Sequence, residues 1–300
     1  MQVSATSFYD WQQRFATEQA CVEAIAAERW PDGFRCPHCG HDHGWLYAAR
    51  RRYECARCYR QTSITSGTVF HGSRVPLTKW FWTLYLVSAD KGGVSALRLS
   101  KIVGVSWRTA YVMLRALRTV MAERDGQYRL SEPIEVDDAY IGANKTGKAG
   151  RGAGRTPVLV AIEKTEDGTP GFVAIEVLDS LAKPEIVDFA KRRLQPGSVC
   201  HTDAFSSLSG LAVQVTHIAK VTSPEEADDW LPWVHVVISN LKRFLLGTFH
   251  GAVRAHRLQE YLDEFVYRFN RRFWEEQIPN RLLALCACPA TPAQPRGTGV

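Results

Sequence analysis

Two cysteine pairs constrain the fold of this 300-residue chain more than any other feature. Cys36 and Cys39 form one CxxC motif, Cys55 and Cys58 form a second, and fifteen residues separate the two motifs. Each CxxC turn directs two thiolates toward one point, so the two motifs together predict a tetrahedral site for structural zinc. Four thiolates complete that site, and the nearby histidines are expected to be surface residues. The metal would replace a hydrophobic core that so short a module cannot build.

The composition of the whole chain is that of an ordinary globular protein with a modest positive charge. Hydrophobic residues make up 45% of it, charged residues 23%, and the net charge is +6. These values exclude a mainly disordered, collagen-like or coiled-coil chain and allow a nucleic-acid partner. The most apolar run, Trp80–Val87, is too short to cross a bilayer. With no signal-peptide pattern at the N-terminus, we expect a cytosolic protein without a membrane partner.

Residues 76–124 have a helical pattern that is interrupted by one tight turn. A short helix is expected at Ser95–Ile102 and a longer one at Trp107–Val120, with the turn Gly104–Ser106 between them and Ser106 as the N-cap. This order is typical of a helix-turn-helix. The candidate DNA contacts on its second helix are Arg108, Tyr111, Arg115 and Arg118. An ordinary helical hairpin with solvated arginines is the alternative.

The segment from 133 to 275 predicts a mixed α/β domain. Strands are expected at Ile134–Ile141, Pro157–Glu163, Gly171–Val177, Ser198–Thr202 and Val213–Ile218. Helices are expected at Lys183–Leu194, Pro232–Leu246 and Arg257–Arg272. Residues 142–155 are rich in glycine and basic residues and predict a mobile cationic loop. Its candidate DNA contacts are Lys145, Lys148 and Arg151.

Acidic residues occur inside the first of these strands and at the end of the fourth. Strand alternation places Glu135 and Asp137 on one face and Asp138 on the other, and Asp203 follows a short apolar strand. Aspartates at the ends of neighbouring strands can converge on divalent cations, which favour carboxylate oxygens. An Asp203 that caps a helix and an Asp137 paired with an arginine remain an equal alternative on spacing alone.

Several motifs together resemble those of DDE-type insertion-sequence transposases, in the family with an N-terminal zinc ribbon and a ribonuclease-H-like core. The matching segments span about residues 8 to 275 and include Arg29–Gly40, Cys55–Cys58, Gly67–His71, Ile134–Asp137, Tyr140–Gly142, Asn240–Gly251, Tyr261–Phe265 and Arg268–Arg272. The resemblance implies DNA cleavage and strand transfer that depend on Mg²⁺ or Mn²⁺. The implied partners are the terminal inverted repeats of the element, target DNA and further copies of the chain in a synaptic complex.

The same resemblance implies which acidic residues are catalytic. Asp137 corresponds to the first acid and Asp203 to the second. Asp138 stands where relatives often have Glu, and it is kept as a reserve for the first position.

The third catalytic position varies in the family among Glu, Asn and His, and the helix predicted at 232–246 offers no carboxylate at its start. A ligand seven residues before a lysine fits the family pattern, which selects His235 and assigns Lys242 to a DNA phosphate. Asn240 is the competitor for the third position. A histidine buried in the core without a catalytic role is the further alternative for His235.

The expected fold class is therefore a multidomain α+β protein. The expected boundaries are an N-terminal helical segment at 1–33, a zinc ribbon at 34–72, a helix-turn-helix region at 73–128, a ribonuclease-H-like catalytic domain at 129–276 and a disordered tail at 277–300. The expected function is that of a DNA transposase. A non-catalytic DNA-binding regulator built on the same zinc ribbon and helix-turn-helix is the alternative, because the third carboxylate is missing.

Overall fold

The computed structural model divides the chain into two compact units. The residues that it describes are 7–131, 133–142, 155–223, 226, 229–251 and 253–288. Unit 1 comprises Met1–Asp90, Val94–Val120 and Phe273–Val300, and unit 2 comprises Lys91–Gly93 and Met121–Arg272. Among the described residues, no helix combines the length and the apolar character that a bilayer crossing requires.

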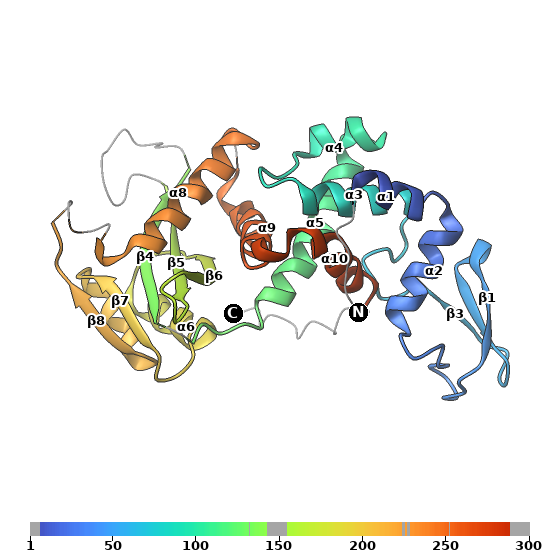
Figure 1. The fold of residues 1–300 in the computed structure, drawn as a ribbon, viewed down its shortest axis with the longest axis horizontal. Coiled ribbons are helices and arrows are strands. Elements are labelled where there is room, and N and C mark those ends of the chain that lie inside the picture. Colours follow the sequence, from blue (N-terminus) through green and yellow to red (C-terminus); the bar gives the residue numbers. More distant parts are fainter. Residues whose placement is uncertain are drawn as a thin grey trace, which may run out of the picture. The chain divides into compact units, whose positions relative to one another are not determined.

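Unit 1 contains a core of helices (Figure 1), and aromatic side chains pack between two of them. Its helices are α1 (Phe8–Arg14), α2 (Glu18–Arg29), α3 (Leu77–Ala89), α4 (Ala96–Val103), the first part of α5 (Trp107–Asp125) and α10 (Ile278–Ala287). Trp11 is fully buried, and its indole N–H donates to the backbone oxygen of Phe81 at 2.9 Å. The rings of Phe15 and Phe81 meet edge to face, with 4.6 Å between their centroids. These contacts attach α1 to α3.

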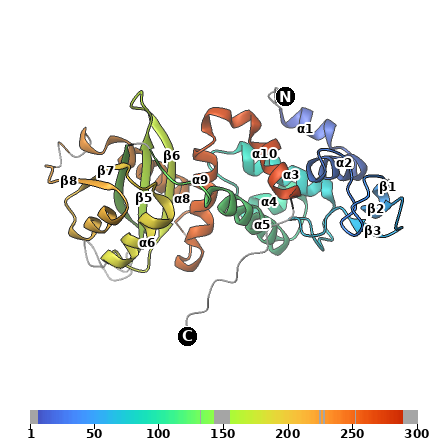
Figure 2. The ribbon, with the colours of Figure 1, turned by 90° about the horizontal axis from the view of Figure 1, so that it is seen from below.

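Helix α10 corrects the expectation of a disordered tail at 277–300. Leu282, Leu283 and Cys286 are at most 1% exposed, and the N–H of Val69 donates to the backbone oxygen of Cys286 at 3.2 Å. Figure 2 shows α10 beside α3. Pro279 is compatible with the helix because it lies in the first turn, where a backbone N–H has no intrahelical acceptor. The apolar spacing at 278, 282 and 286 was the sequence signal for this helix, and residues 289–300 lie outside the described part.

The helix-turn-helix arrangement expected from the sequence is present. Gly104 ends α4 with a left-handed backbone at φ +67°, a conformation that favours glycine. The side chain of Ser106 caps α5 by accepting the N–H of Thr109 at 3.1 Å. The inward face of α5 is buried as expected and consists of Ala110, Met113, Leu114 and Leu117.

A small antiparallel sheet follows α2. Its strands lie in the order β1 (Gly44–Tyr47), β2 (Arg52–Cys55) and β3 (Gln61–Ser63). Its hydrophobic cluster has three buried residues, Phe34, Cys36 and Cys55, against which Trp30, Tyr53 and Cys58 pack while partly exposed. So small a cluster supports the expectation that a metal contributes to the stability of this module.

Unit 2 is built on a mixed five-stranded sheet in the order β6-β5-β4-β7-β8 (Figures 1 and 2). Strand β4 is antiparallel to β5 and parallel to β7, while β5 and β6 are antiparallel and β7 and β8 are parallel. The strands are β4 (Ile134–Ile141), β5 (Thr156–Lys164), β6 (Pro170–Val177), β7 (Val199–Asp203) and β8 (Thr216–Lys220). All match the expected strands closely except β8, because a 3-10 helix occupies Ser206–Val213. This mixed sheet is consistent with a ribonuclease-H-like core.

Helices cover both faces of the sheet, and each face has its own hydrophobic core. Alternate residues of β5 supply the two cores: Val158, Val160 and Ile162 on one side, Leu159 and Ala161 on the other. The first core includes α8 (Pro232–Gly247) and α9 (Leu258–Phe269), and the second includes α6 (Lys183–Arg193). Successive residues of β5 point to opposite faces, and both faces are covered by helices. The sequence of β5 is therefore apolar at nearly every position.

The end of α5 belongs to unit 2, where a buried ion pair fixes it. The guanidinium of Arg271 donates to both carboxylate oxygens of Asp125, at 2.8 and 3.2 Å, and both side chains are nearly inaccessible. The amide of Asn270 also donates to Asp125, at 3.0 Å, and its oxygen accepts the backbone N–H of Val173 in β6. Such a bidentate pair is strongly oriented, and it joins the ends of α5 and α9 to the sheet.

Asp263 in α9 is a partly buried acid whose ionisation affects the stability of the fold. The pKa of its carboxyl is raised to about 6, chiefly by burial and also by nearby Glu176 and Asp125, while the hydrogen bond from Gln259 and the charge of Arg193 oppose the rise. Because the folded-state pKa lies above the ordinary 3.8, the folded state favours the protonated acid. The ionised form therefore destabilises the fold, little near pH 4 and fully above about pH 6.

We expect Asp263→Asn to raise the free energy of unfolding by about 1–3 kcal/mol at pH 7.5, and by much less at pH 4. The substitution removes the charge and keeps an oxygen that can accept the Gln259 hydrogen bond. Urea unfolding of the full chain at both pH values measures the effect, with Asp188→Asn on the exposed side of α6 as the control. An equal change at both pH values would contradict the assignment.

Candidate functional site

The parallel pairing of β4 and β7 brings two aspartates together. The register aligns Ile134 with Cys200, Glu135 with His201 and Val136 with Thr202. The next residues are Asp137, in the middle of β4, and Asp203, the last residue of β7, and they therefore lie side by side at the edge where the pairing of these two strands ends. Ligand-binding groups commonly gather at such an edge.

Helix α8 brings a histidine to the same edge. The imidazole Nε2 of His235 lies 3.5 Å from carboxylate Oδ2 of Asp137, and both side chains are partly buried. Lys242 is exposed on α8 seven residues further on, which is close to two helical turns and thus on the same side of the helix. Asn240 lies about 140° around the helix from His235. Of the two candidates for the third position, the structure places His235 beside the first aspartate.

The electrostatic environment of Asp137 is that of a crowded anionic site. The pKa of its carboxyl is raised to about 6, chiefly by burial and also by the carboxylates of Asp138 and Asp203. The backbone N–H of Asp138, which donates to Asp137 at 2.8 Å, and His235 act in the opposite direction. Partly buried acids that raise one another's pKa are stabilised by a cation between them.

These residues offer the donor types that suit a divalent cation. Asp137 and Asp203 supply carboxylate oxygens, which Mg²⁺ and Mn²⁺ prefer, and His235 supplies a nitrogen, which Mn²⁺ accepts more readily. Asp203 is held by its hydrogen bond from the N–H of Phe205, at 3.0 Å. Among groups of three or more possible metal ligands in the described part of the chain, only the four cysteines have ligand atoms that all lie within 4.8 Å of one another. The ligand atoms of Asp137, Asp203 and His235 are therefore spread more widely than those of the cysteine cluster.

Two tryptophans beside the site had no role in the sequence analysis. The indole N–H of Trp230 donates to the backbone oxygen of Thr202 in β7 at 2.8 Å. The indole N–H of Trp233 donates to the backbone oxygen of Gly168, in the turn between β5 and β6, also at 2.8 Å. Both tryptophans therefore hold the beginning of α8 against the sheet. Their spacing of three residues around Pro232 was the available signal.

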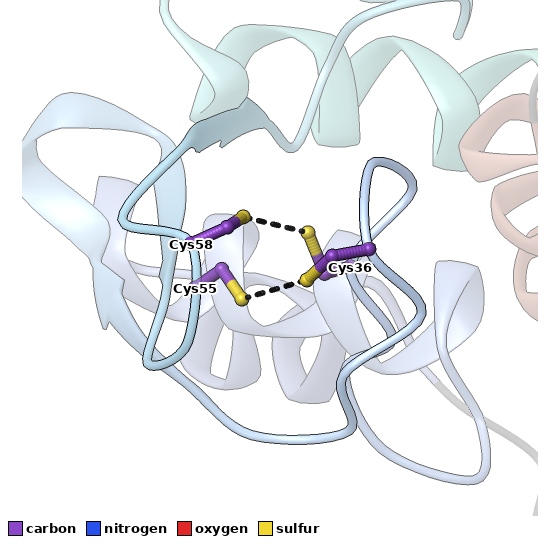
Figure 3. A group of neighbouring side chains, drawn as sticks. Cys36, Cys55 and Cys58 are labelled. Atoms are coloured by element: carbon purple, nitrogen blue, oxygen red, sulfur yellow. Dashed lines mark hydrogen bonds between the residues drawn. The ribbon is translucent and has the colours of Figure 1, made fainter.

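The four cysteines of the CxxC motifs form one cluster (Figure 3). The sulfur atoms of Cys36 and Cys58 are 3.7 Å apart, and those of Cys39 and Cys55 are 3.6 Å apart. With Zn–S bonds of about 2.3 Å, the edge of a ZnS₄ tetrahedron is about 3.8 Å, so the cluster fits structural zinc. His38 is directed to Arg60 at 3.1 Å, which agrees with its expected place outside the metal site.

The expected DNA contacts on α5 divide into exposed and buried residues. Arg108 and Arg115 are exposed, and the ring of Tyr111 stacks on that of Trp107 with 5.4 Å between centroids. Arg118 is 2% exposed, so its assignment as a DNA contact was wrong. It lies four residues after the buried Leu114, on the inward face of the helix. The expected cationic loop falls almost entirely outside the described residues, at 143–154. Its candidate DNA contacts Lys145, Lys148 and Arg151 lie in that part.

Comparisons with known proteins agree with this arrangement. Residues 16–61 match the model of the transposase zinc-ribbon domain, and residues 129–270 match that of the ISXO2-like transposase domain. The two matches together cover more than half of the chain, in the order zinc ribbon then catalytic-type domain. The chain belongs to the transposase family that these two domains define.

One relative comes from Halobacterium salinarum and is described as an uncharacterized protein in the transposable element ISH50. It is 33% identical to this chain over 138 residues, and the alignment covers 45% of each protein. The chain thus spans less than half the length of this relative.

Proposed function

We propose that this protein is a DNA transposase that cleaves the ends of its own insertion sequence and joins them to target DNA. The observation that carries the proposal is the convergence of Asp137, Asp203 and His235 from β4, β7 and α8 at one edge of the sheet. Membership of a transposase family supports the same reaction class. Phosphodiester cleavage and strand transfer are both phosphoryl transfers, for which paired aspartates on divalent cations are suited.

Each of the site residues has a separate part in this proposal. Asp137 and Asp203 would hold Mg²⁺ or Mn²⁺, and His235 would complete the ligand set. When bound, these cations would activate a nucleophilic oxygen and stabilise charge on the phosphoryl group. Lys242 is exposed on the same side of α8 and would bind a phosphate of the DNA backbone. Asp138 is directed to the opposite face of β4 and serves the site only through its charge and its N–H.

The proposed partners are the terminal inverted repeats and target DNA. The zinc ribbon and the helix-turn-helix would recognise the repeats. Two ends must be joined in one reaction, so we propose that copies of the chain assemble in a synaptic complex. The reaction places the protein at the DNA of the cell, in the cytoplasm and at the nucleoid.

A non-catalytic DNA-binding regulator is the second candidate. One specific observation favours it: an imidazole, which offers no negative charge, occupies the position beside Asp137 where a carboxylate would bind a hard cation more strongly. The two aspartates, which crowd one another at a cost in stability, favour the enzyme instead.

A strand-transfer assay tests the proposed function. Purified protein is incubated with a labelled DNA duplex that carries one repeat end, with a target plasmid, and with Mg²⁺ or Mn²⁺. A transposase yields nicked repeat ends and labelled plasmid, both dependent on the cation. Tight repeat binding without either product under both cations would support the regulator.

A further prediction concerns DNA recognition by α5. Arg108→Ala and Arg115→Ala should each weaken binding to repeat DNA. If each arginine neutralises one phosphate, the slope of log K against log salt becomes smaller in magnitude by about 0.9. Binding isotherms at several salt concentrations measure both effects, with Arg281→Ala on α10 as a matched control. Unchanged affinity in both variants would assign recognition to another surface, most directly the zinc ribbon.

A further inference from the structure

Helix α8 begins without a cap from its own sequence. Leu231, at the N-cap position, has no side-chain oxygen, and Pro232 has no backbone N–H. The first N–H groups of the helix are those of Trp233 and Val234, which need an acceptor outside the helix. Both donate to the same oxygen, Oε2 of Glu135, at 2.9 Å each. The carboxylate of a distant strand thus provides the cap.

Glu135 is a buried carboxylate whose two oxygens face different partners, hydrogen bonds at Oε2 and an ion pair at Oε1. It is 0% exposed, and its second oxygen, Oε1, lies 3.4 Å from the ammonium nitrogen of Lys164 at the end of β5. A buried carboxylate is tolerated only when it is paired and hydrogen-bonded in this way, and the positive end of a helix is a favourable place for it. An ordinary core position would hold an apolar residue instead. The presence of this charge therefore calls for a specific role.

The strand that carries Glu135 also carries the first aspartate of the site. Asp137 follows Glu135 by two residues and lies on the same face of β4. On the helix, His235 directly follows the two capped residues and points its Nε2 toward Asp137 at 3.5 Å. The same short segment of β4 therefore carries Asp137 and, through Glu135, holds the helix that carries His235.

We propose that Glu135 is the positioning residue of the active site: it holds the first turn of α8 so that His235 faces Asp137. The proposal rests on the proposed function for the identity of the site, but the capping itself is a property of the folded chain. Its loss would free two N–H groups and allow the beginning of α8 to move away from β4. His235 would then share a cation with Asp137 less often.

Glu163 offers a matched control for the loss of a buried glutamate. It is 7% exposed, lies on β5, and accepts backbone N–H groups from Ser131 at 2.8 Å and Phe172 at 3.2 Å. These hydrogen bonds join β5 to the segments before β4 and at the start of β6. Neither of them involves the first turn of α8. Glu135→Ala and Glu163→Ala therefore remove similar buried interactions at different places.

The test compares these variants and Glu135→Gln in the full chain. Hydrogen exchange followed by mass spectrometry reports on the peptide that covers residues 231–241, and the paramagnetic resonance of added Mn²⁺ reports its dissociation constant. In Glu135→Ala we expect exchange at the first turn of α8 to rise by at least about tenfold. We expect the Mn²⁺ dissociation constant to rise by about 10–100-fold, the usual effect of losing a residue that orients a ligand.

Glu135→Gln keeps an oxygen for both N–H groups and loses the ion pair with Lys164. It should restore slow exchange and bring Mn²⁺ affinity to within about threefold of the natural protein. Glu163→Ala should lower the overall unfolding temperature and leave both readouts at the α8 peptide and the cation site unchanged.

Two results would overturn the proposal: slow exchange at 231–241 in Glu135→Ala, or the same loss of Mn²⁺ affinity in Glu163→Ala as in Glu135→Ala. Should Glu135→Ala not fold, fast exchange or weak Mn²⁺ binding in Glu135→Gln would count against capping as the cause. A natural protein that binds no Mn²⁺ would refute the proposed function, and the exchange data would still decide whether Glu135 holds the helix.

Discussion

Asp137→Asn and Asp203→Asn should each reduce cleavage of repeat DNA by at least about a thousandfold. Loss of a single neutral donor to a reacting oxygen costs about 10²–10³ in rate, and a metal-ligating charge contributes more than one such donor. Asparagine keeps the shape of the side chain and removes its charge, so the change isolates electrostatics. Repeat binding should remain nearly unchanged, because the elements proposed to recognise the repeats lie in unit 1. Cleavage rates and binding isotherms on one DNA substrate measure both quantities.

Two control variants test whether the loss of cleavage is specific to Asp137 and Asp203. Asp188→Asn, on an exposed position of α6, should leave cleavage unchanged. Asp138→Asn should have a small effect, since its side chain is directed to the other face of β4. An active Asp137→Asn together with an inactive Asp138→Asn would move the first catalytic position by one residue. Activity in both Asp137→Asn and Asp203→Asn would remove the enzymatic proposal altogether.

The third position is tested on the same helix. His235→Ala should lower cleavage far more than Asn240→Ala, because the imidazole of His235 lies 3.5 Å from Asp137. His235→Glu should keep or raise activity with Mg²⁺, which prefers a charged oxygen ligand. The opposite order, with Asn240→Ala inactive and His235→Ala active, would identify Asn240 as the third residue.

Cys55→Ser should remove zinc from the protein and unfold the module that contains β1, β2 and β3. The natural chain should carry one zinc per molecule by elemental analysis, and the variant close to none. Binding of structural zinc contributes roughly 10 kcal/mol or more to the folding of small modules. The hydrophobic cluster here has only three buried residues, two of which are cysteines of the site. The remaining packing is too small to hold the sheet together without metal.

Cys288→Ser is the appropriate control for this prediction, because Cys288 is exposed. Cys286 is unsuitable, since it is fully buried in α10 and a serine there would place a hydroxyl in the core. Circular dichroism and limited proteolysis follow the module in each variant. A zinc-free natural protein with an intact module would contradict the metal site.

Local sequence patterns predicted the parts of this fold that are stabilised locally. The CxxC turns and the turn at Gly104 and Ser106 depend on neighbours within a few residues, and all are present. Arg118 was predicted to contact DNA, although helical periodicity indicates that it is buried. It lies four residues beyond Leu114, which the same periodicity places on the inward face of the helix. A charged residue type was given more weight there than helical periodicity.

The arrangement of the candidate site depended on pairing between distant segments. Alternation placed Asp137 on a face of β4, but only the parallel register with β7 shows that Asp203 is its neighbour. A strand alone does not specify its partner, because the same alternation fits several sheet orders. Helix α10 was missed for a similar reason. Its apolar stripe is buried by α3 and α2, which lie about 200 and about 260 residues earlier in the chain.

The cap that Glu135 provides has a consequence for the synthesis of the protein. The acceptor and the N–H of Trp233 are 98 residues apart, so the first turn of α8 gains its stabilising partner only after β4 has joined the sheet. An isolated short helix without a local cap is poorly populated in water. Helix α10 is synthesised later still, and because it packs against α2 and α3, unit 1 also completes its core only near the end of synthesis. A chain that ends before α10 would therefore lack part of the core of unit 1, even with α8 in place.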